Sequence, residues 1–229
     1  MSFCLVTLAL AAAPGRSQQG DDFQLWLGTM LSGRFGARDS EAGRYRWWLE
    51  AQDRQRDDWE HFALGFVRPA LGYDLHPRLT FWAGYAYLAN DVALREPFDE
   101  HRLWQQLSWN LPVDFLPLHS RSRLEQRFVE TGAETGWRYR QLLKAAPALS
   151  SNGRLYASLW DEVFVDLNDT RWGQRQGLRQ NRAFAGLGLY LGEARSKTLE
   201  VGYLNQWIDR RGRDNTVNHG LVVWLTINF

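Results

Sequence analysis

The feature that most constrains this chain is a series of long segments in which apolar and polar side chains alternate. The clearest segment is the last one, where Leu221, Val223, Leu225, Ile227 and Phe229 share one face at the period of two that defines a β-strand. An apolar face that ends on an aromatic residue suits the closing strand of a barrel whose outside lies in lipid. The final strand of a soluble sheet has the same pattern, so the rest of the chain has to decide between the two.

The same alternation predicts eleven strands after residue 22. Most of them are about 10–13 residues long, whereas a soluble strand is typically about 5–6 residues and a tilted membrane strand needs about 9–11. Strand length therefore favours a transmembrane barrel over a soluble sandwich. The predicted strands cover residues 23–34, 44–55, 60–74, 78–89, 100–111, 119–130, 136–146, 154–166, 177–191, 197–208 and 217–229.

The number of strands is the weakest part of this prediction. Bacterial single-chain barrels have an even number of strands, so we expect about twelve, with ten as the next choice. The missing or wrongly divided strand would lie in 23–43 or 55–75. Within 60–74, Pro69 predicts a bulge at which the side chains switch face, because proline cannot donate to the strand ladder.

The two faces of the strands have different compositions. The apolar faces carry aromatic residues near the strand ends, as in the girdles of membrane barrels: Tyr45, Tyr87, Trp109, Trp137 and Trp207. The connections at 74–78 and 191–197 are short, whereas those at 90–99, 168–176 and 209–216 are long and charged. Short turns on one side and long loops on the other are typical of outer-membrane barrels, in which the apolar face points outward and the polar face lines the lumen.

The first twenty residues differ from the rest of the chain. An apolar run over 3–13 is followed by a polar segment, which predicts a secretory signal peptide in residues 1–20 and a barrel domain in 21–229. Cys4, the single cysteine, lies in that run, so the mature chain would hold no disulfide. We find no linker and no second domain.

Charged residues gather on the face that we expect to be the inner one. Arginines and glutamates on neighbouring strands would lie close enough for ion pairs. Arg102 with Glu100, and Arg46 with Glu50, would extend the set. Two interpretations stay open: a salt-bridge network that fills and rigidifies a small barrel, or a pore lining that selects or binds a small anionic solute. The set consists of Arg121, Arg123, Glu125, Arg127, Arg138, Arg140, Glu162, Arg182 and Glu200.

The sequence predicts no catalytic residues, no metal ligands and no cofactor. The five histidines show no ligand spacing, and the formal net charge of +1 does not favour nucleic-acid binding. A lipid-modifying enzyme is the rival hypothesis, and it requires a Ser or Asp within reach of His219 or another histidine at the rim. A soluble periplasmic ligand-binding barrel is the third, and it requires an apolar interior.

Several motifs resemble those of an uncharacterised bacterial family, the domain of unknown function 2490, whose members are expected to be outer-membrane barrels. The resemblance covers most of 22–229 and implies a Gram-negative outer membrane, with no activity to carry over. The motifs are residues 84–87 (GYAY), 102–106 (RLWQQ), 123–128 (RLEQRF), 180–184 (QNRAF), 202–206 (GYLNQ) and 218–219 (NH).

We therefore expect an all-β, single antiparallel transmembrane barrel in the outer membrane, either structural or a small porin-like pore. Its partners would be outer-membrane lipid and the barrel-assembly machinery, which would recognise the C-terminal strand ending at Phe229.

Overall fold

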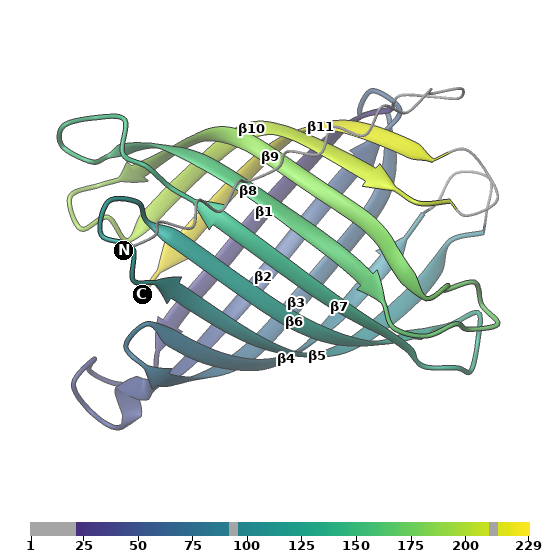
Figure 1. Cartoon of the computed structure of the whole chain (residues 1–229), viewed down its shortest axis with the longest axis horizontal. Coiled ribbons are helices and arrows are strands. Elements are labelled where there is room, and N and C mark those ends of the chain that lie inside the picture. The colour runs from purple at the N-terminus through teal and green to yellow at the C-terminus, as the bar shows by residue number, and fades with distance from the viewer. Residues whose placement is uncertain (1–21, 92–95, 211–214) are drawn as a thin grey trace, which may run out of the picture.

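The computed structural model describes residues 22–91, 96–210 and 215–229. The signal peptide predicted for residues 1–20, with Cys4, lies outside the described residues. One closed barrel of eleven strands accounts for nearly all of the described chain (Figure 1). Within that part of the chain, no helix is long and apolar enough to span a membrane.

Each of the eleven predicted strands is present, with bounds that differ from the prediction by at most two residues. The strands are β1 (Asp22–Arg34), β2 (Tyr45–Arg56), β3 (His61–His76), β4 (Leu79–Asn90), β5 (Phe98–Leu111), β6 (Leu118–Val129), β7 (Gly136–Ala145), β8 (Leu155–Asp166), β9 (Gly177–Leu191), β10 (Lys197–Ile208) and β11 (Thr216–Asn228). A single 3-10 turn, η1 (Ala42–Arg44), lies between β1 and β2.

The prediction of twelve strands is wrong. Neighbouring strands are antiparallel except at the closure, where β1 pairs with β11 in parallel, with Leu25 opposite Leu221 and Leu31 opposite Ile227. An odd number of strands makes the first and last strand run in the same direction, and a parallel ladder still closes the sheet. The even-number rule therefore misled us, although the alternation had located every strand.

The expected switch of face at Pro69 is also wrong. β3 runs through Pro69 without a break, and Arg68 and Ala70 on either side of it both remain buried inside the barrel. The register shifts of this region lie elsewhere, between Arg54 and Gln55 on β2 and near the end of β3. Pro69 interrupts the pairing with β4, in which Arg68 and Pro69 have no partners, but it stays paired with Leu49 of β2, and the alternation of side chains continues.

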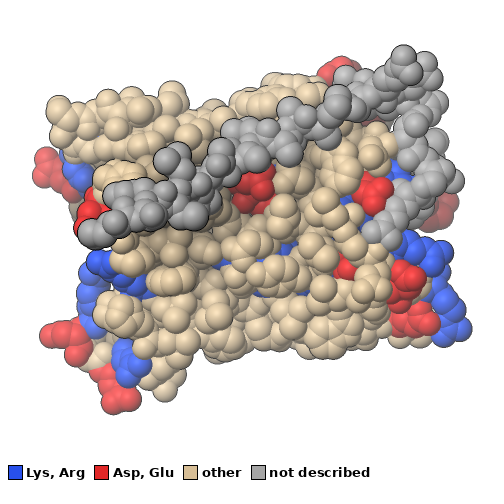
Figure 2. All heavy atoms as spheres, in the orientation of Figure 1, with Lys and Arg blue, Asp and Glu red and all other residues tan. Residues whose placement is uncertain are grey.

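The wall of the barrel is apolar on the outside. Large hydrophobic side chains are exposed along the strands, among them Leu71 at 64%, Leu187 at 53% and Leu103 at 49%. Figure 2 shows the same distribution, with charged side chains mainly at the two ends and uncharged residues over most of the wall between them. Contiguous exposed apolar surfaces of this kind are uncommon on soluble monomers.

The outer face of β5 to β9 carries some polar side chains, and these form hydrogen bonds with one another across neighbouring strands. Gln105 and Gln126 exchange amide hydrogen bonds of 3.2 and 3.0 Å across β5 and β6. Further along, Asn181 donates to both carboxylate oxygens of Asp161 at 3.0 Å. Each of these groups has its partner on the neighbouring strand, which lowers the cost of an apolar surrounding.

The interior combines aromatic rings with buried charges. Trp48, Trp82 and Trp104 form one aromatic cluster, and Trp26 packs with Phe184 in another. The rings require small residues on the neighbouring strand. A Cβ atom added to Gly84 would lie 2.7 Å from Cε2 of the Trp104 ring and 2.6 Å from the Pro69 carbonyl oxygen.

The two rims differ in their connections. The C-terminal rim, where β11 ends, carries connections 35–44, 77–78, 112–117, 146–154 and 192–196, and the opposite rim carries 57–60, 91–97, 130–135, 167–176 and 209–215. The two short connections expected from the sequence lie at the C-terminal rim and the three long ones at the opposite rim. Connection length does not separate the two rims completely, since 35–44 and 146–154 at the C-terminal rim are also long.

Candidate functional site

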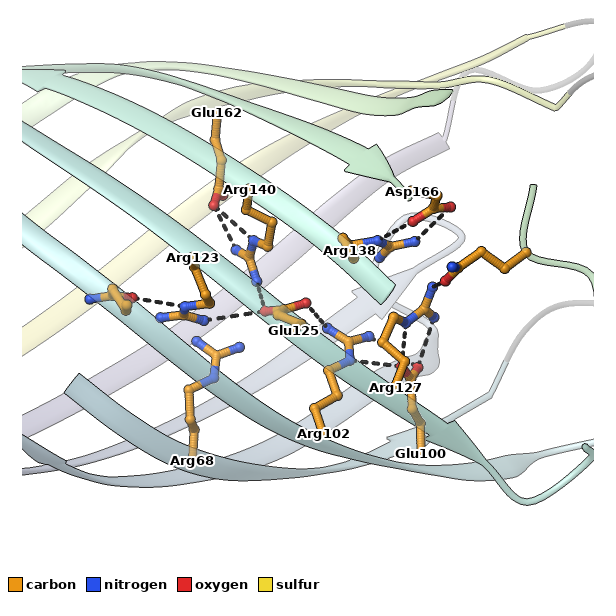
Figure 3. A network of polar contacts seen from close by, with 12 residues as sticks. Arg68, Glu100, Arg102, Arg123, Glu125, Arg127, Arg138, Arg140, Glu162 and Asp166 are labelled. Atoms are coloured by element: carbon orange, nitrogen blue, oxygen red, sulfur yellow. Dashed lines mark hydrogen bonds and ion pairs between the residues drawn. The ribbon is translucent and has the colours of Figure 1, made fainter. Parts of the chain in front are cut away.

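The charged residues predicted from the sequence lie on the inner face of β6 to β10. On β6 to β8 they meet, together with Glu100 and Arg102 of β5, in one network of ion pairs (Figure 3). Most of them are buried, three of them almost completely: Glu125 is 0% exposed, Arg123 is 1% and Glu162 is 2%. Buried charges of this kind are tolerated only when they are paired and hydrogen-bonded, so their partners define the site.

Glu125 is the centre of the network. Its Oε1 accepts hydrogen bonds from Nη1 of Arg140 at 2.7 Å and from Nη1 of Arg123 at 3.5 Å. Its Oε2 accepts from Nη1 of Arg102 at 3.4 Å. Three guanidinium groups from β5, β6 and β7 therefore converge on one carboxylate from β6.

Glu100 forms a second centre closer to the opposite rim. Arg102 donates to it from Nε at 2.7 Å and Nη2 at 3.0 Å, and Arg127 donates from Nε at 2.6 Å and Nη2 at 3.1 Å. Both arginines are thus bidentate, the strongest geometry for this pair. Arg127 also donates to Oε1 of Gln174 at 3.1 Å, which ties the 167–176 connection to the lumen.

Glu162 links the network to the C-terminal side. Its Oε1 accepts from Arg140 at 2.8 and 2.9 Å and from Nη2 of Arg121 at 2.7 Å. Arg138 pairs instead with Asp166, at 2.6 and 3.3 Å.

The expected pairing of Arg46 with Glu50 is wrong, and two other residues of the charged set, Arg182 and Glu200, lie outside the network. Arg182 lies directly opposite Glu162 on the neighbouring strand, yet no carboxylate lies within 4.0 Å of Arg182 among the described residues. Glu200 pairs with Lys144 and accepts a 2.8 Å hydrogen bond from Tyr156. Arg46 pairs with Asp74 at 3.5 Å, while Glu50 pairs with Arg68 at 2.9 Å.

The sequence interpretation missed several members of the site. Asp166 is one of them, although it continues the alternation of Glu162 and Phe164 on the inner face of β8. Arg68 was missed because a face switch was expected at Pro69. No sequence signal pointed to Gln174, because it belongs to a connection and reaches the lumen only through the fold.

The lumen contains a cavity of about 430 Å³. His119, Tyr190 and Asn228 line it near the C-terminal rim, and Trp26, Arg54 and Arg182 line its other end. We call this cavity the vestibule. Glu100, Arg127 and Asp166 do not line it.

Two sets of polar contacts lie on the wall between the vestibule and the opposite rim. On β5 to β8 these are the ion pairs of Glu100 and Asp166. On β9 to β11, Asn218 donates to Gln206 at 3.2 Å, and Gln206 donates to the Gln180 oxygen at 2.7 Å in the amide orientation that satisfies its neighbours.

The opposite rim is held by a further ion pair outside the strands. The backbone N–H of Arg171 donates to Glu134, and the Arg171 side chain donates to the same carboxylate at 2.7 Å. These hydrogen bonds, the backbone one first, lower the pKa of Glu134. The indole N–H of Trp172 donates to the Glu134 carbonyl oxygen at 2.7 Å, so connections 130–135 and 167–176 are joined.

The histidines do not form the arrangement that a lipid hydrolase needs. His219 contacts the hydroxyl of Tyr203, and His101 contacts that of Tyr85. His119 meets the Asn110 side-chain oxygen at 3.0 Å. Within residues 22–91, 96–210 and 215–229, no histidine has a Ser or Asp side chain as its hydrogen-bond partner.

Comparisons with known proteins identify a family and name no activity. The family model described as "Protein of unknown function (DUF2490)" matches residues 23–218. An uncharacterised protein of Methylorubrum extorquens is 32% identical over 231 residues, which cover 100% of this chain and 96% of that protein. No solved structure matches the chain.

Proposed function

Starting from a chain that belongs to the DUF2490 family of proteins of unknown function, we propose that it is an outer-membrane β-barrel with a closed lumen. In this proposal the barrel is a non-conducting structural and binding protein whose vestibule opens at the C-terminal rim. The observation that carries it is the distribution of polarity: arginine and glutamate are buried inside, and aliphatic residues are exposed outside.

The dimensions and the ends of the barrel support a membrane location. The strands have 10 to 16 residues, and about 9–11 tilted residues cross a bilayer. Tyr45 and Trp109 lie near the C-terminal rim, and Tyr87 and Trp137 near the opposite rim, all at least 37% exposed. Aromatic residues in these positions match the two interfacial girdles of a membrane barrel.

The charged interior disfavours a soluble ligand-binding barrel. That hypothesis required an apolar interior, whereas Arg123, Glu125 and Glu162 are buried in the lumen. In water the outer wall would have to be covered by another surface.

The ion pairs support a closed lumen over an open pore. Carboxylates from β5, β6 and β8 are each held by at least two arginines (Figure 3). Across the lumen, the guanidinium carbon of Arg123 lies 5.6 Å from the Trp48 ring of β2. A conducting path would have to break several buried pairs, each costly to separate. The excess of arginine would favour anions only if such a path formed.

The C-terminal strand supports recognition by the barrel-assembly machinery. Phe229 is 76% exposed at the rim, where its ring stacks on Trp47 at 5.8 Å and its N–H donates to the Ser32 carbonyl at 2.8 Å. A Phe229→Ala variant should reach the outer membrane in smaller amounts, while the purified variant still refolds in detergent.

Planar-bilayer recording tests the closed lumen. The protein is purified in detergent and reconstituted, and insertion is checked independently by heat-modifiable gel mobility and protease protection in vesicles of the same lipid. We expect inserted protein without steady conductance. Steady conductance would refute the closed lumen, and a protein that stays monomeric in buffer without detergent would refute the membrane location.

A further inference from the structure

Two arginines that line the vestibule away from the C-terminal rim have no carboxylate partner among the described residues. Arg54 donates from Nε and Nη2 to the Gln52 side-chain oxygen, at 2.8 and 2.6 Å. Arg182 is held by the Gln180 oxygen, with 2.9 Å to Nη2. Neither guanidinium has an ion pair within the described residues, although Arg121 and Arg140, which line the same cavity, are both paired with Glu162.

Both unpaired guanidinium groups converge on one indole ring. The guanidinium carbon of Arg54 lies 3.7 Å from the Trp26 ring centroid, and that of Arg182 lies 4.8 Å from it. Arg182 also lies 4.6 Å from the Phe164 ring. Cation–π contacts hold the side chains in place but do not neutralise them.

Two positive charges so placed form a site for an anion. Arg182 is only 9% exposed, and both arginines line the vestibule. A buried charge without a partner is costly, and the cost falls when an oxyanion accepts its hydrogen bonds. The side chains that fix the two guanidiniums, Gln52 and Gln180, are neutral, so they leave the positive charge available.

The wall next to these arginines is aromatic. Trp160 and Phe184 stack with their ring centroids 5.1 Å apart, and both line the vestibule together with Trp26 and Trp224. The cavity volume of about 430 Å³ falls in the range of small-molecule pockets. An apolar wall beside a fixed pair of charges suits a ligand with an apolar body and one anionic end.

We propose that the vestibule binds a small organic oxyanion, a carboxylate or a phosphate ester with an aromatic or apolar body. The oxyanion lies between Arg54 and Arg182, and the body lies along Trp26, Trp160 and Phe184. The proposal depends only on the vestibule. It therefore stands or falls independently of the membrane location and of the conductance result.

Isothermal titration calorimetry on the full chain in detergent tests the ligand class. The probes are benzoate, phenyl phosphate, benzyl alcohol and inorganic phosphate, each also titrated into protein-free micelles. We expect binding of benzoate or phenyl phosphate, and the stronger of the two identifies the oxyanion. Benzyl alcohol should bind at least about tenfold more weakly, because charge-assisted hydrogen bonds are worth about 1.5–3 kcal/mol and 1.4 kcal/mol is tenfold.

Three variants separate the site from the rest of the lumen. Arg54→Gln and Arg182→Gln should each weaken binding of the preferred probe about tenfold or more, with gel mobility unchanged. Arg121→Gln is the matched control, because it removes a charge from the same cavity that is already paired with Glu162. It should leave binding within about twofold.

Four outcomes would overturn the proposal. They are equal binding of benzyl alcohol and the two aryl anions, binding of inorganic phosphate alone, no binding of any probe to folded protein, and an equal loss in Arg121→Gln and Arg182→Gln. Should a glutamine variant fail to fold, Arg54→Lys and Arg182→Lys keep the charge but lose the guanidinium geometry. They should bind with intermediate affinity, and unchanged affinity in both would also contradict the proposed geometry.

Discussion

Replacing Glu125 by glutamine tests whether the network holds the barrel together. The variant keeps the size of the side chain and one oxygen acceptor, but it removes the charge on which three arginines converge. Arg140 keeps Glu162, and Arg102 keeps Glu100. Arg123 loses its single carboxylate partner and keeps only Gln106, at 2.8 Å, as a hydrogen-bond partner among the described side chains.

The cost follows from Arg123. Its 3.5 Å contact with Glu125 corresponds to an attraction of about 5 kcal/mol at an effective dielectric constant of about 20. The variant does not lose the whole of this attraction as stability, because the carboxylate of Glu125 no longer has to be desolvated on folding. Removing one partner of a buried pair costs about 3–5 kcal/mol. Because the glutamine oxygen still accepts from Arg140, we expect about 3 kcal/mol, the lower end of that range.

Equilibrium urea unfolding in lipid vesicles, followed by tryptophan fluorescence, measures this loss. Arg123→Gln and the double variant complete a cycle in which the unpaired charge is removed again. We expect a coupling free energy of about 1–3 kcal/mol, so the double variant should be more stable than the sum of the single losses predicts. Glu193→Gln, on the exposed connection between β9 and β10, is the control and should change stability by less than about 0.5 kcal/mol.

The reasoning would be refuted by an unchanged midpoint and slope for Glu125→Gln. Strictly additive losses in the cycle would show that Arg123 and Glu125 do not act as a pair. A change in the slope alone would mean that the compactness of the folded or unfolded state had changed instead.

Three further predictions concern other parts of the barrel. Glu162→Ala should lower the free energy of unfolding by about 3–5 kcal/mol, and an unchanged midpoint in the same urea assay would rule out a closed network. Gly84→Ala should lower the free energy of unfolding by about 1–3 kcal/mol, because the new methyl group displaces the Trp104 ring. Ala83→Gly on the same strand is the control, since the positive φ of Gly192 makes Gly192→Ala unsuitable. A Gly84→Ala variant that is at least as stable as the original protein would contradict the packing. The pKa of Glu134 is lowered in the folded protein, so its bond to Arg171 is present above the ordinary pKa of 4.5 and is lost as the pH falls through the lower folded value. Protection of the Arg171 amide in hydrogen exchange should drop at that pH. The drop should be absent in Glu134→Gln.

The strands could be predicted from the sequence because a barrel wall enforces the period of two on every strand. The same rule placed Glu125, Arg140 and Glu162 on the inner face. Nothing local in the sequence distinguishes eleven strands from twelve, since the closure depends on how the first and last strands meet. We therefore relied on the rule that bacterial barrels have an even number of strands, and that rule gave the wrong number.

Partner choice could not be predicted, because inward side chains reach diagonally as well as straight across. Glu125 lies opposite Arg138 and Glu162 lies opposite Arg182, yet both carboxylates bind Arg140. Long arginine side chains span diagonal neighbours easily. The sequence therefore identifies the members of the network, and the register with the tilt of the strands decides which of them bind. The unpaired state of Arg182, on which the anion site rests, is a consequence of that choice.

The parallel pairing of β1 with β11 also separates the two ends of the barrel sequence in space. β1 enters the sheet at the rim opposite to the one where β11 leaves it. Epitopes placed before Asp22 and after Phe229 would therefore face opposite sides of any membrane that the barrel spans, and one preparation labelled from outside would report its orientation. A circular permutant would need a linker that runs the full height of the wall, about a dozen extended residues at about 3.3 Å each, where an even-stranded barrel would need only a turn.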